Sequence, residues 1–175
     1  MLIPILILVA AIVVLFVIIV LMQATDFKVS RSVKVRASAE KAFGQVNDLH
    51  LMNVWNPWMK LDPNIKQTYS GAASGVGAVY DWDGNNNVGA GRQTIVETRP
   101  PELVRMKLEF FRPFAGVNEV QFTCVAEGDQ TVVTWSMTGQ RNFIMKAMGL
   151  FCSMDKMCGG SFEEGLASMK TIVEA

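Results

Sequence analysis

The longest uninterrupted apolar run of the chain lies at its N-terminus. Residues 2 to 22 contain no charged and no strongly polar side chain. About twenty apolar residues in a helix, at about 1.5 Å each, span a hydrocarbon core of about 30 Å. The run therefore predicts a transmembrane anchor, residues 1–23, followed by one domain, residues 24–175. A cleaved signal peptide is the alternative, although the run exceeds the usual apolar length of such peptides and no Lys or Arg precedes it.

After this run, apolar and polar residues alternate with the period of a half-buried strand. A first strand is predicted from Phe27, followed by a short helix that begins after Ser38. The stretch from His50 to Asn64 contains Pro57 and Pro63 and no sustained period, which predicts an irregular connection. Six further short runs follow, separated by turn residues. We therefore expect about seven strands, mostly antiparallel.

The alternation also assigns faces to the predicted sheet. Tyr80 and Trp82 share one face of their strand, and Asp81 and Asp83 share the other. The same rule places further apolar side chains on one face, namely Val104, Met106, Leu108, Phe110, Val133, Trp135 and Met137. A twisted antiparallel sheet with one apolar face must be covered by another element.

The stretch from Arg141 to Glu174 is the long helical pattern that can cover it. Its second half carries an apolar stripe at helical spacing, formed by Phe162, Leu166, Met169 and Val173. Ser161 with Glu164 forms a capping box, which predicts a helix start after the Gly159-Gly160 pair. The half from Phe143 to Met157 is apolar on more than one side, and we expect it to be a gate that bends or moves at these glycines.

Composition narrows the classes of function. Sixteen Lys plus Arg balance sixteen Asp plus Glu, so no nucleic-acid interface is predicted. The three cysteines, Cys124, Cys152 and Cys158, lack the spacing of a metal site and are odd in number, which predicts free thiols and favours a reducing compartment. Residues 28 to 36 carry four Lys or Arg, which favours a cytoplasmic domain.

Candidate reactive groups are few. His50 is the one histidine, and its place beside a predicted helix end suggests a surface or capping residue. Asp81, Asp83, Asn85 and Asn87 alternate as in a calcium loop. However, the loop lacks the glycine at its sixth position and ends at Arg92 rather than at a glutamate, so we interpret it as a hairpin end. The sequence predicts no catalytic residue, no metal site and no cofactor.

The order strand, helix, connection, six strands and long helix resembles the helix-grip fold of the START-like or SRPBCC superfamily. The polyketide cyclase and dehydrase-like branch is the most similar. The likeness covers residues 27 to 174 and is carried by WNPW with Asp62-Pro63, the Gly75-x-Gly77 turn before VYDW, the Gly89-x-Gly91 turn, TVVTWSMTG and GGSFEEGLASMK. It implies an α+β domain with an antiparallel sheet of about seven strands wrapped on the C-terminal helix. It also implies a cavity between sheet and helix for lipids, sterols, isoprenoids, hormones or polyketides, and no shared catalytic motif.

The resemblance and the anchor together predict membrane-anchored binding or transfer of a hydrophobic small molecule, of the lipid or isoprenoid class. We expect the ligand to contact Trp55, Trp58, Tyr80, Trp82, Met106, Leu108, Phe110, Phe122, Trp135, Met137, Phe143, Met148 and Phe151. One alternative is a cyclase or dehydratase-like enzyme that uses His50, Glu97 or Tyr80 as acid or base in the same cavity. Another is a regulatory or interaction domain with a filled core.

Overall fold

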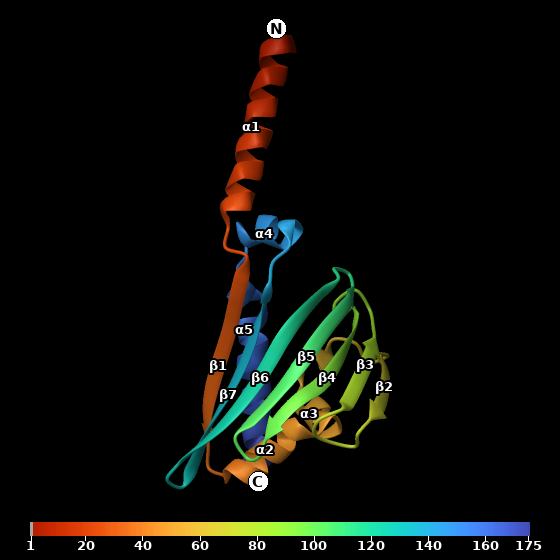
Figure 1. Ribbon diagram of the computed structural model, residues 1–175, viewed down its shortest axis with the longest axis vertical. Helices are drawn as coiled ribbons and strands as arrows, with labels where there is room; N and C mark the ends of the chain where they lie inside the picture. Colours follow the sequence, from red (N-terminus) through yellow and green to blue (C-terminus); the bar gives the residue numbers. More distant parts are fainter. Residues whose placement is uncertain (1) are drawn as a thin grey trace.

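The computed structural model describes residues 2–175, which form one long N-terminal helix and one α+β domain (Figure 1). Helix α1 is Leu2–Met22. The domain follows with β1 (Asp26–Val35), α2 (Ala39–Asn47), α3 (Leu49–Trp55), the 3-10 helix η1 (Pro57–Lys60), β2 (Lys66–Gly71), β3 (Ala78–Asp83), β4 (Ala90–Arg99), β5 (Leu103–Arg112), β6 (Gly116–Glu127), β7 (Gln130–Gln140), α4 (Phe143–Gly149) and α5 (Met154–Glu174). The predicted fold class is confirmed.

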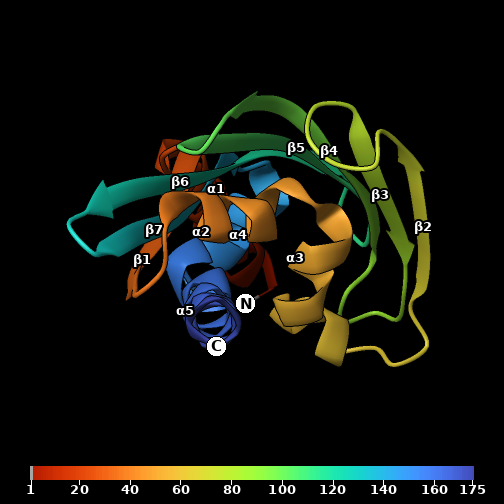
Figure 2. The same ribbon diagram turned by 90° about the horizontal axis from the view of Figure 1, so that it is seen from below.

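The seven strands form one antiparallel sheet in the order β1-β7-β6-β5-β4-β3-β2. Figure 2 shows the sheet curving around α2, α3 and α5, which lie on its concave side. The predicted apolar face is that concave face, because Tyr80, Met106 and Val133 are all buried there. The core of the domain is therefore the layer between this face and the three helices.

Helix α5 packs directly against the sheet at Trp135 of β7. The ring of Trp135 stacks on the ring of Phe162 with centroids 4.2 Å apart and planes 6° from parallel. One turn further on, Gly165 leaves no room for a side chain, since an added Cβ would lie 2.9 Å from Trp135 Cζ3 and 3.1 Å from Pro57 Cδ. The predicted stripe is buried along its length, from Phe162 to Val173.

The predicted helix start at Ser161 is wrong, and the predicted bend at Gly159-Gly160 is not found, because α5 runs without a break through both glycines. The break lies at residues 150 to 153, and α5 begins after Ser153, whose side chain accepts a hydrogen bond from the Lys156 amide. Gly159 lies inside α5, where the Arg31 guanidinium occupies the place of a Cβ. The glycine therefore serves a close approach between helix and strand.

The Arg31 side chain ties β1 to α5 at this glycine. Its Nη1 lies 2.7 Å from the Asp155 carboxylate and its Nε lies 2.6 Å from Glu163, one turn before and one turn after Gly159. These contacts raise the pKa of Arg31 and lower the pKa of Asp155, in each case chiefly through the hydrogen bond between the two. The contact fixes the register of α5 along β1.

The predicted irregular connection from His50 to Asn64 is also wrong in part, because it contains α3 and η1. Asp48 caps α3 by accepting a hydrogen bond from the His50 amide at 2.8 Å. Asn56 caps η1 in the same way, and Pro57 occupies the first helical position, where its missing N–H costs nothing. The capping side chains of Asp48 and Asn56 thus allow two short helices in a stretch where the prolines had suggested an irregular connection.

The glycines of α5 give a matched test of this packing. We predict that Gly165→Ala lowers the free energy of unfolding by about 1–3 kcal/mol, because the added methyl group meets the rigid Trp135 ring and Pro57. Gly160→Ala, which points into open space, should be neutral or stabilising by up to about 1 kcal/mol through helix propensity. Unfolding of the full chain in detergent, followed by circular dichroism, measures both. A Gly165→Ala variant at least as stable as wild type would contradict the packing described.

Candidate functional site

A cavity of about 150 Å³ lies between the sheet and α5. Side chains from α3, η1, all strands from β3 to β7, and α5 line it. Such a volume holds a benzene-sized group, but it is below the few hundred Å³ of a typical site for a larger ligand. The domain is thus neither solid nor widely hollow.

Aromatic rings form much of the cavity wall. Trp135 lies at the centre of one cluster, stacked on Phe162 and in edge contact with Trp58 at 5.7 Å between centroids. On another part of the wall, Trp82 stacks on Tyr80 at 5.9 Å and meets Phe110 edge-on at 5.7 Å. Edge contacts of this kind hold rings in defined orientations, so the shape of the cavity is set by packed side chains.

Part of the predicted ligand-contacting set lines this cavity. These residues are Trp58, Tyr80, Trp82, Leu108, Phe110, Trp135 and Met137. Further lining residues were not predicted, namely Met52, Asn56, Met59, Ile65, Val88, Gln93, Val120, Cys158 and Phe162. Most of them lie on helices or in the turn before β4, where strand alternation gives no information.

Trp55, Met106 and Phe122 do not line the cavity, and their predicted place there is corrected. All three are almost fully buried. The rings of Trp55 and Phe122 pack behind Trp135, with centroids 5.7 and 5.0 Å from its ring. The Gln93 amide nitrogen contacts the Met106 sulfur, and Gln93, unlike Met106, is part of the cavity lining. These side chains share the inward face but lie one layer deeper.

Phe143, Met148 and Phe151 also lie outside the cavity, on α4 and the link to α5. They are exposed, and Phe151 shows 84% of its surface. The reason is the break at residues 150 to 153, which turns α4 away from the sheet and toward the base of α1 (Figure 1).

Helix α4 is fixed to the junction between α1 and β1. The Arg141 amide donates to the Thr25 carbonyl at 2.7 Å, and Lys146 Nζ lies 2.9 Å from the Thr25 hydroxyl. Val20, near the end of α1, is fully buried. The exposed apolar side chains of α4 therefore lie directly beside the long apolar helix.

The three candidate acid or base groups are dispersed. The His50 side chain is 60% exposed and stacks on Tyr69 at 3.8 Å, outside the cavity. Glu97 forms an ion pair with Arg105 and does not line the cavity. Tyr80 does line it, and burial raises the pKa of its hydroxyl well above the usual value, so the group remains protonated.

The Asp and Asn side chains of the hairpin between β3 and β4 are engaged with the chain itself. Asp81 pairs with Arg92, and Asp83 pairs with Arg112. The Asn85 amide donates to the buried Asp62 at 2.6 Å, which ties this hairpin to the segment after η1. Within residues 2–175, no group of three or more His, Cys, Asp or Glu side chains is placed to hold a metal ion.

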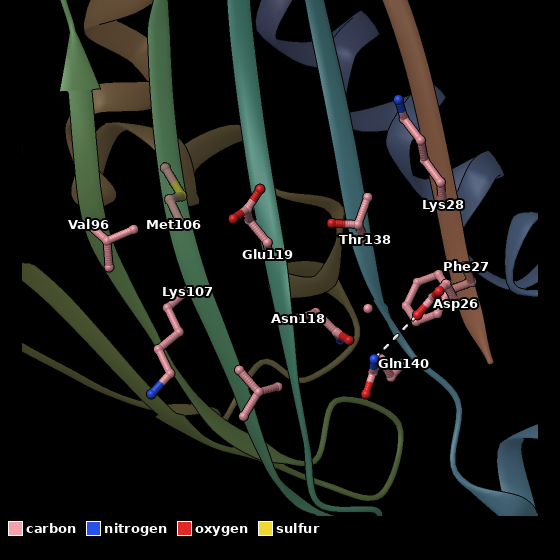
Figure 3. A pocket seen from close by; sticks show the side chains of 12 residues that line it. Asp26, Phe27, Lys28, Val96, Met106, Lys107, Asn118, Glu119, Thr138 and Gln140 are labelled. Carbon is pink, nitrogen blue, oxygen red and sulfur yellow. Dashed lines mark hydrogen bonds between the residues drawn. The ribbon is translucent and has the colours of Figure 1, made fainter.

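A second hollow lies on the outer face of the sheet (Figure 3). Its volume of about 880 Å³ is larger than that of the inner cavity, but the hollow is a groove that is open to solvent. Lys28, Lys107 and Glu119 give it mixed charge. Enclosure by apolar walls is the feature of small-molecule sites, so the inner cavity is the better candidate despite its smaller volume.

Comparisons with known proteins agree with this architecture. A family model described as "Polyketide cyclase / dehydrase and lipid transport" matches residues 26–174. No curated protein matches the chain. Truncated norcoclaurine synthase from Thalictrum flavum is 13% identical with a TM-score of 0.63, covering 86% of this chain and 96% of that chain.

Two further solved structures show the same likeness. Aha1 from Colwellia psychrerythraea is 18% identical with a TM-score of 0.60, and the match covers 85% of this chain and 96% of that chain. The di-domain ARO/CYC protein BexL from the BE-7585A biosynthetic pathway is 14% identical with a TM-score of 0.60, covering 91% of this chain and 53% of that chain. At these identities the likeness concerns the fold alone.

Proposed function

We propose, from the premise that this chain belongs to the polyketide cyclase/dehydrase and lipid transport family, that it binds or transfers a hydrophobic small molecule at a membrane. The proposal rests on the cavity between the sheet and α5. Its lining is mostly aromatic and apolar, and within residues 2–175 it contains no charged side chain. Its affinity would come from apolar burial, at about 25 cal/mol per Å² before the cost of ordering the ligand. The ligand class is lipid or isoprenoid.

The size of the cavity limits how such a ligand binds. A volume of about 150 Å³ accepts one ring or a short chain segment. Met59 and Met137 line the cavity, and the flexible thioether side chain of methionine adapts to different shapes more readily than a branched one. A longer ligand would therefore enter by displacing these side chains, with the rest of the molecule outside.

In this proposal α1 is retained as the membrane anchor. It is the described helix that is long and apolar enough to cross a bilayer. Residues 23 to 25 alone separate it from β1, so the domain would lie against the lipid surface. The basic residues between positions 28 and 36 favour a domain on the cytoplasmic side.

Helix α4 and the link to α5 would lie in the interface of the same bilayer. Their exposed apolar side chains are Phe143, Ile144, Met148, Leu150 and Phe151. The segment from Arg141 to Met154 contains Arg141 and Lys146 and no acidic residue, a pattern suited to an anionic lipid surface. Since the link leads into α5, where Cys158 lines the cavity, it is the proposed gate for ligand entry.

Co-purification tests the binding function. We predict that organic-solvent extraction of the full chain releases a hydrophobic compound identifiable by mass spectrometry. Val120→Phe, which would fill the cavity, should lower the amount at least fivefold, whereas Val117→Phe on the same strand is exposed and should leave it unchanged. An equal yield from both variants, or no compound from wild type together with no change in melting temperature across a lipid panel, would argue against the proposal.

The position of α4 is tested with a fluorescent label on Cys152, which is exposed beside Phe151. In nanodiscs that contain anionic lipid, an environment-sensitive dye at Cys152 should emit at shorter wavelength and be quenched by lipid-bound quenchers. A dye on Asp129→Cys, in the hairpin between β6 and β7 at the end of the domain away from α1 (Figure 1), should emit as in water. Both labelled proteins carry Cys158→Ala, and the Asp129→Cys protein also carries Cys152→Ser. Water-like emission at Cys152 in a chain that remains in the nanodisc would reject the interfacial position without rejecting the anchor.

A further inference from the structure

Two polar side chains stand next to each other on the mostly apolar cavity wall. Asn56 also lines the cavity, but its amide is already hydrogen-bonded to Asn53 and to the Trp58 backbone. Tyr80 of β3 and Gln93 of β4 are directly opposite in the antiparallel register. Both line the cavity, and they are only 2% and 5% exposed. Side chains directly opposite in a sheet have Cβ atoms about 5 Å apart, so a hydroxyl and an amide occupy one small area of the wall.

Within residues 2–175, neither group has a strong hydrogen-bond acceptor. Among residues 2–175, the Tyr80 hydroxyl donates to the Met59 sulfur at 3.3 Å, and the Gln93 amide nitrogen contacts the sulfurs of Met52 and Met106. Thioether sulfur is a weak acceptor. Trp135 also lines the cavity, and its buried indole N–H has no hydrogen-bond partner among residues 2–175. The cavity therefore holds donors whose hydrogen-bonding capacity the protein leaves largely unused, which is costly for buried groups.

The same wall is unsuited to a charged ligand group. No Asp, Glu, Lys, Arg or His among residues 2–175 lines the cavity. Tyr80 stays protonated because burial raises the pKa of its hydroxyl. Burial raises the pKa of the lining thiol Cys158 as well, with a further contribution from Asp155. An ion placed here would be desolvated without a counter-charge.

We propose that the ligand is uncharged and carries a carbonyl or ether-type oxygen, which lies against Tyr80 and Gln93 and accepts their hydrogen bonds. This inference rests on the proposed function and specifies the ligand chemistry of that cavity. The apolar remainder of the ligand lies among the rings of Trp82, Phe110 and Trp135. A pure hydrocarbon of equal shape would leave both donors with their weak sulfur contacts.

Two probes of nearly equal shape test the oxygen requirement. Acetophenone has a C=O group at the position where α-methylstyrene has C=CH2. Both compounds are close to the largest size that the cavity admits. We expect the full chain in detergent to bind acetophenone about tenfold more tightly than α-methylstyrene in calorimetric or NMR titration. This ratio corresponds to the net free energy of about one hydrogen bond. Equal affinity for the two probes would overturn this inference and leave the binding function standing. If neither probe binds, both fail.

Variants assign the preference to the two residues. Gln93→Leu and Tyr80→Phe should each reduce the acetophenone preference at least threefold, and the double variant should abolish it, while α-methylstyrene affinity stays within about twofold because the shape of the wall is kept. Gln121→Leu is the matched control, since Gln121 lies on the outer face of β6 and should leave the preference unchanged. A double variant that still prefers acetophenone tenfold would also overturn the proposal.

Discussion

The stacking of Phe162 on Trp135 is the contact on which the rest of the domain depends. It fixes the distance between α5 and the sheet, and Gly165 permits that distance because any Cβ there would strike the Trp135 ring. Trp135 also contacts Trp55 and Trp58, so the short helices α3 and η1 are positioned by the same ring. The cavity is the space that remains beside this cluster, where the sheet curves away from α5.

A second constraint comes from the short connection between α1 and β1. The register pairs Asp26 of β1 with Gln140 of β7, and Gly139 of β7 with Asn118 of β6. The start of β1, the end of β7 and the start of β6 therefore lie together near α1, and α4 follows directly from the end of β7. Phe110 pairs with Gly116 at this same end of the sheet, and Phe110 lines the cavity. In an anchored chain, the cavity would therefore lie in the half of the domain that is closer to the bilayer, which is consistent with a ligand drawn from lipid.

Sequence periodicity predicted the seven strands, their apolar face and the buried stripe of α5, because each depends on a local repeat. It did not predict depth within that face, since Phe122 and Tyr80 have the same pattern although one fills the core and the other faces the cavity. Gly159 suggested a hinge because the sequence does not show that Arg31 lies over it. Gln93 was detectable: it is the polar residue at an inward position of its strand, two before the buried Ile95.

Xenon binding distinguishes a domain in which α5 closes on the sheet over a mostly apolar space from one with a filled core. Xenon occupies dry apolar cavities of this size without needing polar contacts. In crystals of the chain pressurised with xenon, we expect an ordered atom between Trp135, Leu108 and Phe162, and its loss in Val120→Phe. Well-ordered crystals with no xenon between the sheet and α5 would show that side chains fill the core and that the cavity does not exist.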